Sequence, residues 1–254
     1  MRLISPQWSA PSITHAFITT RSGGLSRAPY ESLNLGDHVG DDFAKVIGNR
    51  KIVRSHVPSE PFWLTQTHST KVSTPLSRQD LQGGDPITAD ASVTNVPNEV
   101  LAILTADCLP IFFSSKDGCV IGAAHAGWRG LCAGVIENTA SEMLNLSPGL
   151  SPKDLVAWLG PAIGPESFEV GADVVKAFQD AGLSDPSKAF KTIENKSGKY
   201  LADIYQLARD RLNILGITDI SGGGHCTVKE GQDFFSYRRD GKTGRFASFI
   251  WISK

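Results

Sequence analysis

The feature that most constrains the fold is a run of short apolar segments between Asp90 and His125. Four of them are rich in the β-branched and aromatic residues that favour strands: ASVTN at 91–95, VLAILT at 100–105, LPIFFS at 109–114 and CVIGAAH at 119–125. Each segment is apolar almost throughout rather than at every second residue. The pattern therefore predicts strands that are covered on both faces.

Further strands and helices are expected outside this run. Strands are predicted at four places: 15–20, 61–68, 154–161 and 244–252. Apolar residues at helical spacing predict four helices: 43–57, 131–144, 174–181 and 200–215. Gly216 follows the last of these and is expected to end it. Because strands and helices mix without strict β-α-β alternation, the pattern favours the α+β class, a mixed α/β sandwich of sheets flanked by helices.

Length and composition indicate one globular domain. The chain has 254 residues, of which 41% are hydrophobic and 20% are charged. No low-complexity tract or charged block marks a linker. We therefore expect a single domain over residues 1–254, and we favour a monomer.

Charge and hydropathy exclude several classes of partner. The net charge is −1 and the basic residues are scattered, so the electrostatic pattern of a nucleic-acid-binding protein is missing. The first residues, MRLISPQWSAP, lack the apolar core of a signal peptide, and no apolar run reaches the length of a membrane span. We expect a cytoplasmic protein without a membrane partner, whose four cysteines are free thiols.

Three residues at or near predicted strand ends form the first candidate site: His68, Cys108 and His125. Two imidazoles and a thiolate are good zinc ligands, and three protein ligands leave a fourth position for water or substrate. Their spacing matches no local zinc-finger pattern, so the residues alone favour the plainer interpretation of a buried thiol and two ordinary histidines. In a zinc-free alternative, Cys108 is the nucleophile of a cysteine hydrolase and His125 is its base. His225 and Cys226 form a weaker metal candidate.

Other polar residues suggest proton transfer and anion binding. Asp107, beside Cys108, can orient a ligand or accept a proton, or can simply end a strand. The segment AGWRG precedes a predicted helix, whose N–H groups suit an anion. Clustered cations in TTRSGG and SYRRDGKTGR suit phosphate, although a solvated hairpin tip is the commoner outcome for the latter. The candidate phosphate-binding residues are Arg21, Arg129, Arg238 and Arg239.

Nine segments in order along the chain carry a family resemblance: FITTRSGGLS, NLGDHVGDD, LTQTHST, ADASVTN, TADCLPIFF, GAAHAGWRG, LGPAIGPESFEV, SGGGHCT and FFSYRRDGKTGRFASFIW. Over nearly its full length the chain resembles the YfiH family, also called the laccase-domain or polyphenol-oxidase-like family. In that family the matching histidine, cysteine and histidine bind a catalytic zinc, which implies His68, Cys108 and His125 here. The resemblance also implies a single α/β sandwich.

The oxidase name implies copper, but the residues do not favour it. Multicopper oxidases hold several copper ions with many histidines, often in H-x-H pairs, whereas this chain has six histidines and no such pair. A single site of nitrogen and sulfur ligands suits zinc, although it would also accept copper in a test tube.

The resemblance implies a purine nucleoside enzyme. Its expected reactions are phosphorolysis of adenosine, inosine, guanosine and methylthioadenosine, and deamination of adenosine by zinc-activated water with Asp107 as a proton carrier. Two further alternatives stay open. Bacterial relatives suggest cytoplasmic editing of misbuilt peptidoglycan precursors, and a zinc-stabilised binding module would be no enzyme at all.

Overall fold

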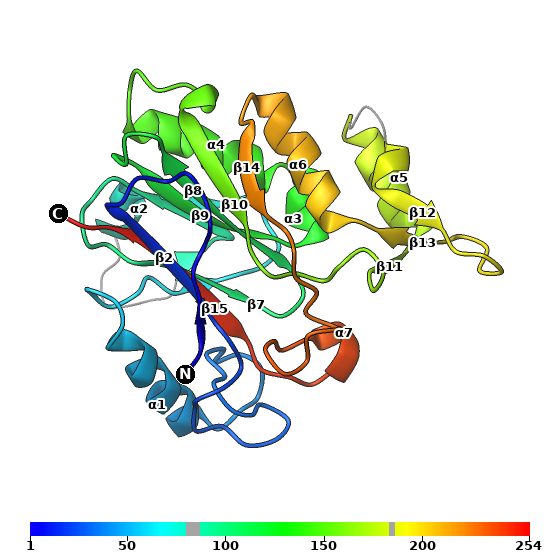
Figure 1. The fold of residues 1–254 in the computed structure, drawn as a ribbon, viewed down its shortest axis with the longest axis horizontal. Coiled ribbons are helices and arrows are strands. Elements are labelled where there is room, and N and C mark those ends of the chain that lie inside the picture. Colours follow the sequence, from blue (N-terminus) through cyan, green and yellow to red (C-terminus); the bar gives the residue numbers. More distant parts are fainter. Residues whose placement is uncertain (80–86, 183–185) are drawn as a thin grey trace.

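Two β-sheets packed against each other form the centre of the protein (Figure 1). The computed structural model describes residues 1–79, 87–182 and 186–254. Within these ranges the larger sheet has six strands in the order β14-β10-β8-β9-β6-β4. Its strands are β4 (Val72–Ser73), β6 (Ala91–Thr94), β8 (Leu109–Ser115), β9 (Ile121–Ala126), β10 (Leu155–Leu159) and β14 (Asp219–Gly222). The pairs β4–β6 and β10–β14 are parallel, and the other pairs are antiparallel.

The second sheet joins the two ends of the chain. It is antiparallel, with the order β1-β2-β15-β7. Its strands are β1 (Leu3–Ile4), β2 (Thr14–Thr19), β7 (Leu101–Thr105) and β15 (Phe246–Ile252). Two small sheets lie beside these: one contains β3 (Leu64–Thr65) and β5 (Ile87–Thr88), and the other contains β11 (Glu169–Gly171), β12 (Phe190–Thr192) and β13 (Lys199–Ala202).

Strand β8 explains why the central segments are apolar throughout. Leu109, Ile111 and Phe113 belong to the core between the large sheet and the helices. Phe112, between them, belongs to the core between the two sheets and stacks on Trp158 with ring centroids 5.8 Å apart. Both faces of the strand are therefore buried, which confirms the prediction and the mixed α+β class.

Helices cover the outer faces of the two sheets (Figure 1). On the large sheet, α4 (Val135–Leu146) packs against β9 and β6, and α6 (Ile204–Leu215) lies beside α4. On the second sheet, α1 (Phe43–Arg54) contributes Val53 to the outer core. The shorter helices are α2 (Pro75–Gln79), α3 (Trp128–Ala133), α5 (Ala172–Asp180), α7 (Tyr237–Asp240), and the 3-10 turns at Pro152–Asp154 and Pro186–Lys188. No helix in the described ranges is long and apolar enough to cross a membrane.

Four sequence predictions need correction. The helix expected over 200–215 begins at Ile204, because Lys199–Ala202 pairs as β13 between β11 and β12. The helix over 131–144 is broken at Gly134, whose φ of 104° separates α3 from α4. The strand expected over 61–68 is only Leu64–Thr65. The segment SYRRDGKTGR forms the short helix α7 rather than a hairpin tip. Gly216, with φ 89°, ends α6 as predicted.

Candidate metal centre and substrate cavity

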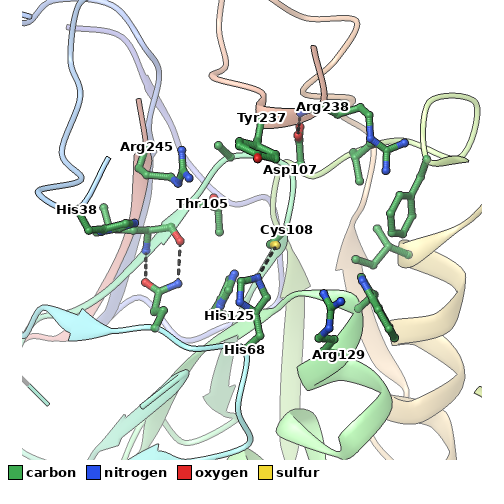
Figure 2. Close-up of a pocket in the computed structure, with 17 residues that line it drawn as sticks. His38, His68, Thr105, Asp107, Cys108, His125, Arg129, Tyr237, Arg238 and Arg245 are labelled. Carbon is green, nitrogen blue, oxygen red and sulfur yellow. Dashed lines mark hydrogen bonds between the residues drawn. The ribbon is translucent and has the colours of Figure 1, made fainter. Parts of the chain in front are cut away.

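Three separate segments bring the predicted metal ligands together (Figure 2). His68 follows β3, Cys108 lies between β7 and β8, and His125 is the penultimate residue of β9. The antiparallel register of β8 and β9 pairs Pro110 with His125, so the start of β8 lies beside the end of β9. Residues that are far apart in the sequence therefore meet at one edge of the large sheet.

The donor atoms of these side chains are close enough to share one ion. They all lie within 4.8 Å of one another. Nε2 of His68 is 3.7 Å from Sγ of Cys108, and the rings of His68 and His125 meet edge to face. In the part of the chain that the structure describes, this is the one group of three or more His, Cys, Asp or Glu residues with such spacing. The trio is a candidate metal site rather than three unrelated residues.

A buried carboxylate that sequence analysis did not assign, Asp90, holds the cluster in place. Its Oδ1 accepts hydrogen bonds from Nδ1 of His125 at 2.8 Å and from the backbone N–H of His68 at 2.9 Å. Its Oδ2 accepts from the N–H of Thr67 and from both the N–H and the hydroxyl of Ser69. A carboxylate on one ring nitrogen fixes the histidine's tautomer and frees the other nitrogen for a metal. The one hint of this role in the sequence is that Asp90 comes directly before a buried strand, β6.

The charges in the cluster stabilise one another. Burial raises the pKa of the Cys108 thiol, but His125 and His68 lower it by more, to about 6. Burial lowers the pKa of His125, whereas Cys108 and Asp90 raise it to about 9. Burial also raises the pKa of Asp90, but hydrogen bonds from His125 and Ser69 hold it well below its usual value. The negative charges of Cys108 and Asp90 therefore favour a positive charge at His125 in the metal-free cluster.

Gly127, directly after β9, leaves the space that the cluster needs. A Cβ at this position would lie 2.6 Å from Cδ2 of His68 and 3.1 Å from Sγ of Cys108. The φ of −64° and ψ of 156° are open to any residue, so space and not backbone conformation requires glycine here. Two imidazoles and one thiolate are the ligand types of zinc sites. The residues present therefore fit a bound metal.

The cluster lines a cavity of about 450 Å³, within the usual range for small-molecule sites. Apolar side chains, including Trp128, Ile163 and Phe168, form part of its wall. Asp107 also lines it, but both of its carboxylate oxygens are hydrogen bonded: Oδ1 accepts from the hydroxyl of Thr227 and Oδ2 from the N–H of Arg238, each at 2.6 Å. These bonds tie the turn before β8 to helix α7.

The structure brings two of the four predicted anion-binding arginines to the cavity. Arg129 and Arg238 line it, whereas Arg21 and Arg239 are not among its lining residues. Arg21 donates to two backbone carbonyls and lies over the ring of Phe235. Arg239 donates to three carbonyls and to the carboxylate of its neighbour in the chain. Both are engaged in holding loops together.

Two further residues of the cavity are outside the four selected candidates: His38 was not singled out, and Arg245 was considered only as one of the clustered cations of its segment. His38, in NLGDHVGDD, and Arg245, in SYRRDGKTGR, both line it. The two residues of the weaker metal candidate have separate partners. Nδ1 of His225 pairs with the carboxylate of Glu230 at 2.7 Å, and Sγ of Cys226 accepts from the N–H of Gly164. Neither belongs to the metal-type cluster found in the described residues.

Comparison with known proteins identifies the family of the chain. Residues 15–253 match the family described as multi-copper polyphenol oxidoreductase laccase. The chain belongs to this laccase-like family. A Haemophilus influenzae relative named purine nucleoside phosphorylase is 50% identical and covers 99% of this chain and 100% of its own. The Escherichia coli relative, named purine nucleoside phosphorylase YfiH, is 48% identical over 99% of both chains.

Solved structures confirm the laccase-like family fold. A crystal structure of a Neisseria meningitidis protein superposes with a TM-score of 0.92 at 45% identity, covering 100% of both chains. YlmD from Geobacillus stearothermophilus superposes with a TM-score of 0.87 at 30% identity, again over 100% of both chains. The family resemblance inferred from the nine sequence segments is thereby confirmed.

Proposed function

We propose that the protein is a zinc-dependent purine nucleoside phosphorylase that also deaminates adenosine. One observation carries the proposal: the cluster of His68, Cys108 and His125 opens on a cavity of about 450 Å³. Relatives that are 50% and 48% identical over the whole chain and are named purine nucleoside phosphorylases support it. We expect phosphate and the nucleosides adenosine, inosine, guanosine and methylthioadenosine as substrates.

Zinc is the metal we propose for His68, Cys108 and His125. When bound, it would act as a Lewis acid and activate water. The chain's own contribution begins with Asp90, which accepts a hydrogen bond from Nδ1 of His125 and so leaves Nε2 as the nitrogen available to a metal. Copper would bind such ligands in a test tube, but we do not expect it to serve the protein's reaction.

In phosphorolysis, an oxygen of phosphate forms a bond to C1′ of the ribose while the C1′–N9 bond breaks. The electron pair leaves with the purine, which takes up a proton, so the products are the free base and ribose 1-phosphate. The apolar wall formed by Trp128, Ile163 and Phe168 suits the purine and keeps water away from C1′. Asp107 is our candidate for carrying the proton, since it lines the cavity and two hydrogen bonds fix its carboxylate.

Deamination differs in the group that enters. The oxygen of water adds to C6 of adenine, and the C6–N6 bond breaks with release of ammonia, so that adenosine gives inosine. This reaction needs no phosphate. We further propose that residues 1–254 act as one domain, as a monomer in the cytoplasm.

The test is to incubate zinc-loaded protein with adenosine, with and without phosphate, and to follow adenine and inosine by chromatography. We expect adenine and ribose 1-phosphate with phosphate, and slow formation of inosine without it. His125→Ala should lose both activities. If neither product exceeds that of the His125→Ala control, the purine proposal is wrong. Activity that survives chelation but stops on thiol alkylation would instead favour the cysteine hydrolase with Cys108 as nucleophile.

A further inference from the structure

The cavity has two unlike sides. The guanidinium of Arg129 lies 4.4 Å from the ring of Trp128, and that of Arg238 lies 5.6 Å from the ring of Phe168. In Figure 2, Arg129 and Arg238 lie on one side of the metal cluster, whereas His38, Thr105 and Arg245 lie on the other. The aromatic rings therefore mark one side of the cavity, and polar side chains mark the other.

Arg245 is a partly buried cation that forms no ion pair in the described part of the chain, although the nearby charges of Cys108 and Asp107 raise the pKa of its guanidinium. Its Nη1 donates to the backbone carbonyls of Thr243 and Gly244 at 3.1 and 3.0 Å. Neither Nε nor Nη2 has a hydrogen bond within the described ranges, and no carboxylate there lies within ion-pair distance. Burial lowers the pKa of this guanidinium, which reflects the cost of removing the charge from water. A bound anion would offset that cost and take the two remaining donors.

The main chain around Arg245 is fixed before any ligand arrives. Its N–H donates to Oδ1 of Asn34, and its carbonyl accepts from the N–H of Leu35. Gly36 leaves room for the side chain, because a Cβ there would lie 2.8 Å from Cγ of Arg245. His38 follows on the same loop and lines the same side of the cavity. Such preorganisation lowers the entropy lost when an anion binds.

The other arginines are less suited to a phosphate. Arg21 and Arg239 donate to loop carbonyls, Arg239 also to the carboxylate of Asp240, and neither lines the cavity. Arg238, like Arg245, uses only Nη1, for the carbonyls of Ser167 and Glu169, but it is exposed and lies over the ring of Phe168, on the aromatic side. Arg129 is exposed and lies over Trp128, on the side suited to a purine.

We propose that Arg245 binds the phosphate of the reaction, beside His38, while the purine packs on the opposite, aromatic side. This assignment rests on the proposed phosphorylase function and names a residue for it outside the four predicted from sequence. The ligand is a phosphate dianion, recognised through Nε and Nη2 of a fixed guanidinium. It is either free orthophosphate or the phosphate group of ribose 1-phosphate in the reverse reaction.

The experiment compares wild type, Arg245→Gln and Arg245→Lys, with Arg27→Gln as control. Arg27 is exposed and does not line the cavity. Steady-state phosphorolysis of inosine gives the KM for phosphate and for inosine. Without nucleoside, broadening of the ³¹P resonance of orthophosphate, and in a second arm of ribose 1-phosphate, reports binding directly. Zinc content and a thermal melt verify that each variant is folded and loaded.

We expect Arg245→Gln to raise the KM for phosphate about 10- to 100-fold, the range for a charge-assisted hydrogen-bonding group, with a much smaller change for inosine. Arg245→Lys should fall between Gln and wild type, because it keeps the charge but loses the planar pair of donors. Broadening should decrease in parallel in both arms, and Arg27→Gln should match wild type. An unchanged KM for phosphate in folded Arg245→Gln overturns the inference and leaves the phosphorylase function intact. Phosphate binding that needs Arg245 in a protein that splits no nucleoside would support the anion site and refute the phosphorylase function.

Discussion

Replacing Asp90 with Asn isolates the contribution of one buried carboxylate to the metal site. Asp90 is fully buried and accepts hydrogen bonds from His125, from the loop that carries His68, and from Ser69. Asparagine has nearly the same shape, but it is neutral and offers one oxygen and one NH₂ group. The NH₂ group of the new side chain therefore faces N–H groups that donate to a carboxylate oxygen in the wild type. Two donors cannot form a hydrogen bond with each other.

The size of the effect follows from those contacts. A hydrogen bond to a charged group contributes about 1.5–3 kcal/mol and a neutral one about 0.5–1.5 kcal/mol, so neutralising the partner of His125 costs about 1–1.5 kcal/mol. A buried donor left without an acceptor costs about 1–3 kcal/mol more. Zinc affinity should fall about 10- to 100-fold, as is usual for groups that orient metal-binding histidines. The melting temperature should fall by about 2–4 °C for each kcal/mol lost.

Competition with a chromophoric zinc chelator at neutral pH measures the affinity. Asp154→Asn is the matched control, because it removes the same charge from a carboxylate that accepts hydrogen bonds from Ser151, in a turn that does not line the cavity. The control should bind zinc as tightly as wild type. If folded Asp90→Asn also keeps wild-type affinity, Asp90 does not position His125 for the metal.

Three further predictions concern the same cluster. Gly127→Ala should lose zinc and activity, because its Cβ would lie 2.6 Å from Cδ2 of His68. Gly224→Ala is the control and should be neutral, because no described atom lies within 4 Å of a Cβ there. Metal analysis and activity assays compare the two variants. Cys108→Ala should stay folded but retain no zinc, against about one ion per chain in wild type, and a fully active, metal-free variant would refute the metal role. In chelator-treated protein, alkylation of Cys108 should increase as pH rises through about 6, because the thiolate forms above its lowered pKa; zinc should protect the thiol, and a midpoint near 9 would contradict this electrostatic picture.

Much of the fold could be predicted because burial on two faces leaves a clear pattern. The strands β7, β8 and β9 were found from apolar runs that the structure buries between layers. The short strand β13 was assigned to a helix, because Tyr200 and Leu201 continue the apolar spacing of α6. It is a strand because it pairs with the nearby β12 and with β11, which is distant in sequence. Local patterns do not contain that information.

The candidate metal ligands were selected largely by resemblance, since their spacing alone favoured unrelated residues. Asp90 was assigned no role, and Arg245 was considered only among the clustered cations of SYRRDGKTGR and was not selected. A carboxylate before a strand and an arginine in a basic loop are common, and their roles depend on which groups meet them in space. Arg239 is the opposite case, a residue that sequence selected for anion binding and that the structure uses elsewhere. Backbone carbonyls and the carboxylate of Asp240 take its donors.

The protein, rather than the metal, holds the ligand loop in shape. His68 has a φ of 60°, a conformation that residues other than glycine seldom adopt. Three successive N–H groups of this loop, from Thr67 to Ser69, donate to the carboxylate of Asp90, which also fixes His125. The same buried group therefore stabilises the strained backbone and orients a second ligand. Removing zinc should leave these contacts in place, so the ligands remain poised and rebinding requires no refolding of the loop.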